Sequence, residues 1–167
     1  MVISRSVRED IDMLRQEYDA LKEGKETLLD MIMEAEMSES VYNSNAIENS
    51  TLTISETEKI LLEMEITREV SVREIFEAKN LARVMEYIRK KVDIHPIDRE
   101  RILLLHQMLI ANINDAIAGR FRAQGEYVRV GTHIAPAPEH IEVMIASAIT
   151  EYGKVSEYIL DRIARFH

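Results

Sequence analysis

Residues 118–139 constrain the fold of this chain most, because they interrupt a sequence that is otherwise patterned for helices. The stretch holds three of the five glycines and two of the three prolines of the whole chain. Within it, residues 126–130 and 132–134 are short runs of β-branched and aromatic character on either side of Gly131, a pattern typical of a β-hairpin. The two prolines then exclude regular structure until a helix can begin at Glu139. The sequence therefore predicts a mainly helical protein with one hairpin.

Composition limits the classes of function open to the chain. Its 167 residues are enough for one domain with a sizeable core. The balance of 30 acidic to 21 basic residues, a net charge of −9, argues against nucleic acid or an anionic membrane as a partner, since either would repel the chain. Cysteine is absent, which excludes disulfides and thiolate chemistry. Because no apolar run approaches the roughly 20 residues that span a bilayer and no signal-peptide pattern is present, we expect a cytoplasmic protein.

The N-terminal segment has a helical seam. Over residues 7–35 apolar side chains recur at alternating steps of four and three, interrupted only at Lys25, and the neighbouring Gly24 lowers the propensity for one unbroken helix. The seam consists of Val7, Ile11, Leu14, Tyr18, Leu21, Leu28, Ile32 and Ala35. Two interpretations stay open. The seam belongs either to a helix or helical hairpin lying on the rest of the domain, or to a surface for self-association, which would make a homodimer.

Helix starts and stops are well marked from residue 53 onward. Two capping boxes are predicted, Ser55-Glu-Thr-Glu58 and Ser71-Val-Arg-Glu74, each ahead of an apolar helix. We expect the second of these helices to end before His95-Pro96, and Asp98 to be the N-cap of the next. After residue 139 the periodicity predicts one helix that ends at Gly153 and a last helix over residues 155–166.

The histidines do not predict a metal site. His106 lies in a strongly apolar helix, so we interpret it as a packed, hydrogen-bonded core residue. His133 and His140 flank the prolines without the spacing that places two ligands on one face of a helix.

Two segments resemble the Fic-domain proteins. The first consists of Ala118-Gly-Arg-Phe-Arg, Val128-Arg-Val-Gly131 and His133-Ile-Ala-Pro-Ala-Pro-Glu139, and it is similar to the family's hairpin flap and the residues that lead into it. The second is Ser44-Asn-Ala-Ile-Glu48-Asn49, which resembles the family's inhibitory motif, [Ser/Thr]-x-x-x-Glu-[Gly/Asn]. Since this motif precedes the rest of the domain, the resemblance is to the class with an N-terminal inhibitory helix.

The catalytic signature of the family, His-x-Phe-x-[Asp/Glu]-Gly-Asn-Gly-Arg-x-x-Arg, does not occur in these 167 residues. The last residues look like the helix that precedes it, so we expect the chain to stop before the signature. The resemblance implies an all-α, Fic-like helical bundle with one hairpin flap, incomplete at the C-terminus. It also implies N-terminal helices with the inhibitory motif over residues 1–52, and the N-terminal part of a Fic domain, including the flap at 118–139, over residues 53–167.

For function, the resemblance implies protein adenylylation, the transfer of AMP from ATP to a target protein's Ser, Thr or Tyr hydroxyl. In the family the motif glutamate pairs with the second arginine of the signature, where the γ-phosphate of ATP would lie. By this resemblance the regulatory residues are Ser44, Glu48 and Asn49. The residues that border the target protein and the nucleotide are those of the flap, namely Val128, Arg129, Val130, Gly131, Thr132 and His133.

The same resemblance sets expectations for cofactors and activity. ATP and Mg²⁺ serve the complete family member, and we expect neither to bind tightly to this chain, which has no catalytic residue of its own. Two functions from different classes follow. The chain is either the regulatory and target-binding portion of a Fic adenylyltransferase, autoinhibited by Glu48 and inactive alone, or a non-catalytic helical interaction module that keeps a Fic-like scaffold.

Overall fold

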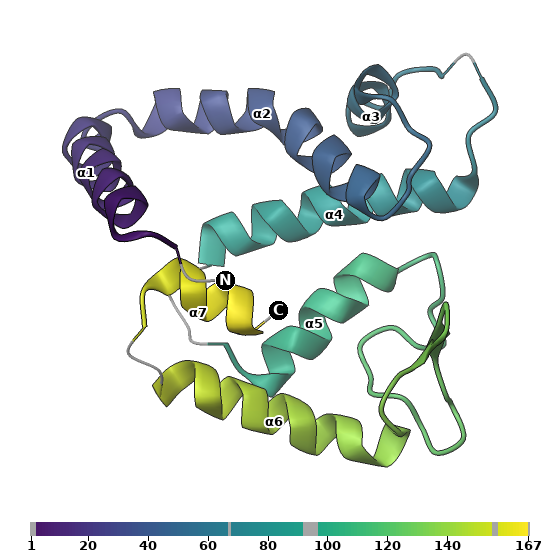
Figure 1. Ribbon diagram of the computed structural model, residues 1–167. Helices are drawn as coiled ribbons and strands as arrows, with labels where there is room; N and C mark the ends of the chain where they lie inside the picture. Colours follow the sequence, from purple (N-terminus) through teal and green to yellow (C-terminus); the bar gives the residue numbers. More distant parts are fainter. Residues whose placement is uncertain (1–2, 67, 92–96, 155–156, 167) are drawn as a thin grey trace. The chain divides into compact units, whose positions relative to one another are not determined.

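The computed structural model describes residues 3–66, 68–91, 97–154 and 157–166 (Figure 1). In these ranges the chain forms seven helices and one two-stranded hairpin, in the order α1 (Arg5–Lys22), α2 (Glu26–Ile47), α3 (Ile54–Leu61), α4 (Val72–Lys91), α5 (Arg99–Ile110), β1 (Arg129–Val130), β2 (His133–Ile134), α6 (Pro138–Lys154) and α7 (Ile159–Phe166). The predicted all-α fold with a single hairpin is confirmed. Within the described ranges, no helix combines the length and the apolar character that crossing a membrane requires.

The chain divides into two compact units. One consists of Met1–Glu36 together with Thr150–His167, and the other is Met37–Ile149. The residues of the predicted inhibitory motif, α3 to α5 and the hairpin all belong to the second unit. The predicted division at residue 52 concerns the roles of the two parts and stays a prediction.

In the first unit, the predicted seam is interrupted and largely exposed. Gly24 has a φ of +71°, a left-handed conformation that ends α1 and separates it from α2. Leu14 and Leu28 leave 59% and 52% of their surface exposed. Polar contacts hold α1 in this unit. The Asp161 carboxylate accepts hydrogen bonds from the Ile3 amide at 3.1 Å and from Arg8 Nη2 at 2.6 Å.

The core of the second unit lies where α2, α3 and α4 meet. Its buried side chains are Val41, Leu52, Ile60 and Ala78. One polar side chain on α4, Asn80, is completely buried. Its Nδ2 donates to the carbonyl oxygens of Leu109 at 3.0 Å and Ala111 at 2.7 Å. The last carbonyls of a helix have no partner within it, so Asn80 joins α4 to the C-terminal end of α5.

Helix starts agree with the sequence at two of three positions. Asp98 caps α5 by accepting from the Arg101 amide at 2.7 Å, and Ser71 caps α4 by accepting from the Glu74 amide at 3.1 Å. The predicted box at Ser55–Glu58 is wrong. Thr53 and Glu56 form a capping box two residues earlier, because burial of Leu52 ends the extended segment there and Thr-Ile-Ser-Glu has the same spacing.

The hairpin is shorter than the two β-branched runs. Arg129 pairs with Ile134 and Val130 with His133, which leaves a two-residue turn that begins at Gly131. The φ of Gly131 is +59°, as a two-residue hairpin turn with glycine in its first position requires.

Four helix termini differ from the predictions or fall outside the described residues. Helix α6 begins at Pro138, one residue earlier than predicted, and passes Gly153 to end at Lys154. The last helix begins at Ile159, and its predicted start at residues 155–156 lies outside the described residues. The predicted stop before His95-Pro96 also lies outside them.

Candidate functional site

The predicted inhibitory motif lies at the C-terminal end of α2, and the backbone geometry there explains the asparagine that ends the motif. Asn49 has a φ of +64°. The Asn49 amide donates to the Ala46 carbonyl at 3.2 Å, and the Ser50 amide donates to the Asn45 carbonyl at 3.1 Å. These two bonds around a left-handed residue constitute a Schellman motif, in which glycine or asparagine is preferred. The left-handed backbone conformation therefore explains the asparagine that follows Glu48.

Ser44 and Glu48 line the same cavity, with a volume of about 420 Å³. Its other lining residues come from α2, α4, α5 and the turn after α5, and they are Asn45, Arg73, Glu77, Leu81, Leu109, Ile110 and Ile113. Ile47 is 80% exposed and is not among them. The expected sharing of one face by Ser44 and Glu48 is thus observed, whereas their regulatory role stays a prediction.

The electrostatics of this motif cavity favour a cation. Arg73 Nε already contacts Glu77 Oε1 at 2.7 Å, which leaves Glu48 as the unpaired charge. Within the described part of the chain, the Glu48 carboxylate has neither a hydrogen bond nor an ion pair. Asn45 Nδ2 is buried without an acceptor among the same residues. The lining of the cavity thus combines a carboxylate that has no partner among the described residues with the aliphatic side chains of Leu81, Leu109, Ile110 and Ile113, whereas the Asn45 donor is enclosed by protein.

The cavity does not suit a triphosphate. Two carboxylates, Glu48 and Glu77, face a single guanidinium that one of them already neutralises, so phosphate oxygens would be repelled. Across residues 3–66, 68–91, 97–154 and 157–166, no group of three or more His, Asp or Glu side chains is arranged to hold a metal ion.

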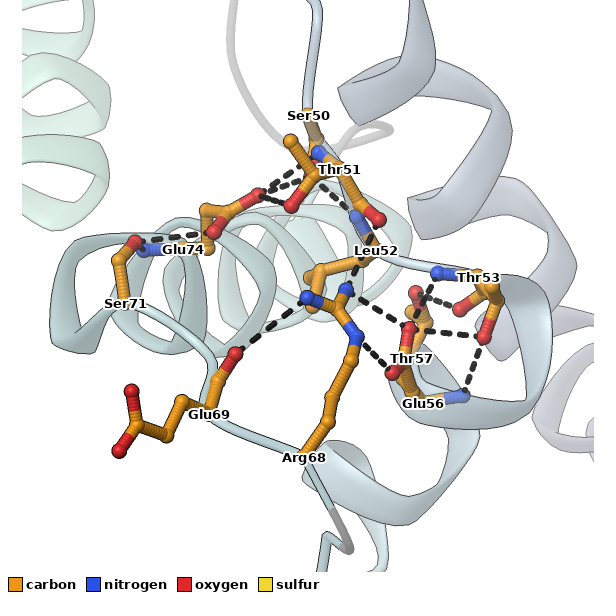
Figure 2. Close-up of polar contacts among 10 residues, drawn as sticks. All are labelled: Ser50, Thr51, Leu52, Thr53, Glu56, Thr57, Arg68, Glu69, Ser71 and Glu74. Carbon is orange, nitrogen blue, oxygen red and sulfur yellow. Dashed lines mark hydrogen bonds and ion pairs between the residues drawn. The ribbon is translucent and has the colours of Figure 1, made fainter.

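A polar network holds the segment that follows the motif (Figure 2). The Glu74 carboxylate accepts from the Thr51 amide at 2.7 Å, from Thr51 Oγ1 at 2.8 Å, from Ser50 Oγ at 3.3 Å and from Ser71 Oγ at 3.0 Å. The Thr51 amide is the main cause that lowers the pKa of Glu74 below its usual value. One carboxylate on α4 thus fixes the residues next to the predicted inhibitory motif.

Arg68 completes this network from the other side. Its guanidinium forms a two-pronged ion pair with Glu56, and its Nη2 donates to the Thr51 carbonyl at 2.9 Å. Hydrogen bonds from Arg68 are the first cause that lowers the pKa of Glu56 to about 2. Thr51 is therefore held through its amide, its hydroxyl and its carbonyl.

The predicted flap residues lie on the hairpin and its turn, apart from the residues that line the motif cavity. Val128 is 42% exposed and Ile134 is 68% exposed. Arg129 Nε donates to the Gly131 carbonyl at 2.8 Å, so this side chain folds back over the turn. The structure thus groups Ser44 with Glu48, but Val128, Arg129, Gly131, Thr132 and His133 do not line the same cavity. The side chain of Val130 lies outside the described part of the chain.

Side chains from the segment before the predicted flap hold its base in place. Arg122 Nη2 donates to the Pro136 carbonyl at 2.8 Å, and Arg120 forms a two-pronged ion pair with Glu126 at 2.7 and 2.8 Å. His106 Nδ1 accepts from the Gly119 amide at 3.2 Å, so the predicted hydrogen-bonded histidine is observed. The exposed hairpin accordingly projects from an anchored base.

Sequence reasoning missed five of the residues described here: Asn45, Arg68, Arg73, Glu77 and Asn80. Only Arg73 and Glu77 carry a local signal, since opposite charges four residues apart on a helix commonly pair. The other three act through partners that are distant in the chain or through burial, which no local pattern reveals.

Comparison with known proteins finds relatives by sequence. No protein-family model matches the chain. The chain is 27% identical over 142 residues, 84% of its length, to the protein adenylyltransferase Fic of Nematostella vectensis, and 26% identical over 166 residues to the protein adenylyltransferase fic-1 of Caenorhabditis briggsae. It spans about a third of the length of each of these relatives, 33% and 32%.

The fold is also found in solved structures. A Fic family protein from Desulfovibrio desulfuricans G20 superimposes with a TM-score of 0.80 at 21% identity, over 100% of this chain and 51% of that protein. Its similarity concerns the fold, whereas the similarity to the adenylyltransferases is one of sequence over most of the chain. The two findings together support a Fic-domain protein.

Proposed function

We propose that this chain is the regulatory and target-binding portion of a Fic-type protein adenylyltransferase, with Glu48 as the inhibitory carboxylate. The observation that carries the proposal is that Ser44 and Glu48 line one cavity in which Glu48 is unpaired among the described residues. The comparisons support the family, and the relatives named above are adenylyltransferases.

A carboxylate without a partner among the described residues and an aliphatic lining suit an arginine side chain. A guanidinium can form a bidentate, charge-assisted pair with the free carboxylate of Glu48, and its aliphatic stem can lie against the apolar side of the cavity. In Fic proteins the motif glutamate meets the second arginine of the signature. Held in this way, the arginine would not be free to bind the γ-phosphate of ATP, and AMP transfer would be slow.

The flap supplies the second part of the proposal. Its exposed strands leave backbone N–H and C=O groups at an edge, where an extended peptide of the target protein can add as a further strand. Main-chain hydrogen bonds do not depend on the side chains of the target, so the flap would present a hydroxyl-bearing residue to the active site without selecting its neighbours.

The test requires a polypeptide that carries these residues together with the Fic signature. Glu48→Gly should raise the rate of AMP transfer from labelled ATP by about tenfold or more, a change of about 1.4 kcal/mol in the barrier. Glu48→Gln should also raise the rate, because it removes the charge while keeping the size. Glu58→Gly is the matched control, and it should leave the rate unchanged.

Two outcomes would contradict the proposal. One is an unchanged rate for both Glu48 variants, which would mean that the motif match is accidental. The other concerns the 167 residues alone, for which we expect negligible AMP transfer, so robust incorporation of labelled AMP would show that catalysis does not need the signature.

A further inference from the structure

We propose that Glu74 is a positioning residue that holds the inhibitory motif in place, acting through Ser50 and Thr51. The proposal rests on the proposed function, since it concerns the same motif. It adds a regulatory element outside the motif itself: a latch, formed by Ser50, Thr51, Glu74 and Arg68, whose release frees Glu48 from its inhibitory position.

The latch joins residues that are far apart in the sequence. Glu74 lies in the first turn of α4 and reaches back 23 and 24 residues to Thr51 and Ser50. Its Oε1 atom takes three donors from these two residues, at 2.7, 2.8 and 3.3 Å, and its Oε2 atom takes the Ser71 hydroxyl at 3.0 Å. Figure 2 shows these bonds converging on one carboxylate. Capping of α4 requires only the contacts with Ser71, so the three hydrogen bonds from Ser50 and Thr51 are additional to it.

Ser50 connects the latch with the inhibitory motif. Its amide donates to the Asn45 carbonyl and closes the Schellman motif around Asn49, while its hydroxyl donates to Glu74. Only Asn49 separates it from Glu48. Ser50 is hydrogen-bonded both to Asn45 and to Glu74, so it cannot move without breaking one of these contacts. Displacement of Ser50 or Thr51 would therefore loosen the turn that sets the direction of the Glu48 side chain.

Removing the charge of Glu74 should loosen the latch without removing its atoms. Hydrogen bonds to an ionised carboxylate are about twice as strong as neutral ones, so Glu74→Gln weakens several bonds together. We expect amide hydrogen exchange at Ser50 and Thr51 to become about tenfold faster in the 167-residue chain. Glu86→Gln is the matched control, since Glu86 is on the same helix and bonds only to Lys90, at 2.5 Å, among the described residues.

A second pair of variants separates the latch from general damage to the fold. Thr51→Val removes the hydroxyl donor to Glu74 but keeps the shape of the side chain, and it should speed exchange in the same segment. Thr51→Ser retains the hydroxyl and should restore slow exchange. If Val and Ser behave alike, or if Glu74→Gln leaves exchange at residues 50 and 51 unchanged, the latch does not exist.

Activity in a polypeptide that includes the Fic signature then tests the link to regulation. Glu74→Gln and Thr51→Val should raise AMP transfer severalfold, and neither should raise it further when Glu48→Gly is already present. A merely structural role would lower the rate instead. Thr51→Ser should keep the low rate of the unaltered protein.

The outcomes distinguish this proposal from the one on which it rests. If Glu48→Gly leaves the rate unchanged, the proposed function fails, whatever Glu74 does. If Glu48→Gly raises the rate while Glu74→Gln speeds exchange but not AMP transfer, the inhibitory motif stands and the regulatory role of the latch is refuted.

Discussion

Asn80 offers a test of how the second unit holds the motif cavity together. Its side chain is completely buried, and its Nδ2 donates two hydrogen bonds to carbonyls at the end of α5, at 3.0 and 2.7 Å. Leu109 and Ile110, at this end of α5, and Ile113 just beyond it line the cavity. Asn80 therefore connects the stability of the fold with the shape of the site.

The expected loss on Asn80→Ala follows from these contacts. Each hydrogen bond contributes about 1 kcal/mol net, and carbonyls left without a partner in a partly buried place cost roughly 1 kcal/mol more in total. We expect the free energy of unfolding to fall by about 3 kcal/mol. With a urea dependence of about 2 kcal/mol per molar for a unit of this size, the midpoint should fall by about 1.5 M.

The assay is urea denaturation followed by circular dichroism, with Asn114→Ala as the control. Asn114 is an exposed asparagine in the turn after α5, so the same substitution there should shift the midpoint by less than about 0.3 M. Equal shifts for the two variants would refute the reasoning, because they would mean that the buried bonds of Asn80 add nothing to stability.

Two further predictions concern the motif turn and acid. Asn49 has a positive φ, so Asn49→Gly should preserve both stability and inhibition, whereas Asn49→Val should destabilise the chain by about 1–2 kcal/mol and raise AMP transfer in a signature-bearing polypeptide; equal melting curves for Gly and Val would contradict this. The pKa values of Glu56 and Glu126 are lowered to about 2 from 4.5, chiefly by hydrogen bonds from Arg68 and Arg120. Since both folded pKa values lie below the ordinary one, their contribution is complete above pH about 4.5 and is lost as the pH falls toward 2, so thermal melts of Glu56→Gln should depend less on pH in this window than those of the unaltered chain.

Much of the fold was predictable because its signals are local. Apolar residues at helical spacing gave the helices, Asp98 and Ser71 gave two of their starts, and the runs around Gly131 gave the hairpin. The predicted capping box at Ser55 failed because two overlapping sequences have the same spacing, and burial of Leu52 selects between them. The N-terminal seam predicts one apolar face, but the left-handed Gly24 breaks it.

The candidate site was less predictable, for a physical reason. Ser44 and Glu48 are four residues apart, so their shared face followed from helix geometry. The partners of the latch are separated by 17 to 24 residues, and their meeting depends on how α3 and α4 pack. The contacts of Asn80 likewise join α4 to α5 across 29 and 31 residues, which no periodicity encodes.

A double-mutant cycle tests the central claim most directly, in a polypeptide that carries both Glu48 and the Fic signature. Glu48→Gln and the second signature arginine→Gln are made singly and together, and the free energy of unfolding of each form is measured in urea. If the carboxylate holds the guanidinium in the motif cavity, the coupling energy should be about 1–3 kcal/mol. A coupling energy within about 0.3 kcal/mol of zero would contradict the account, because additive effects mean that the two side chains do not meet.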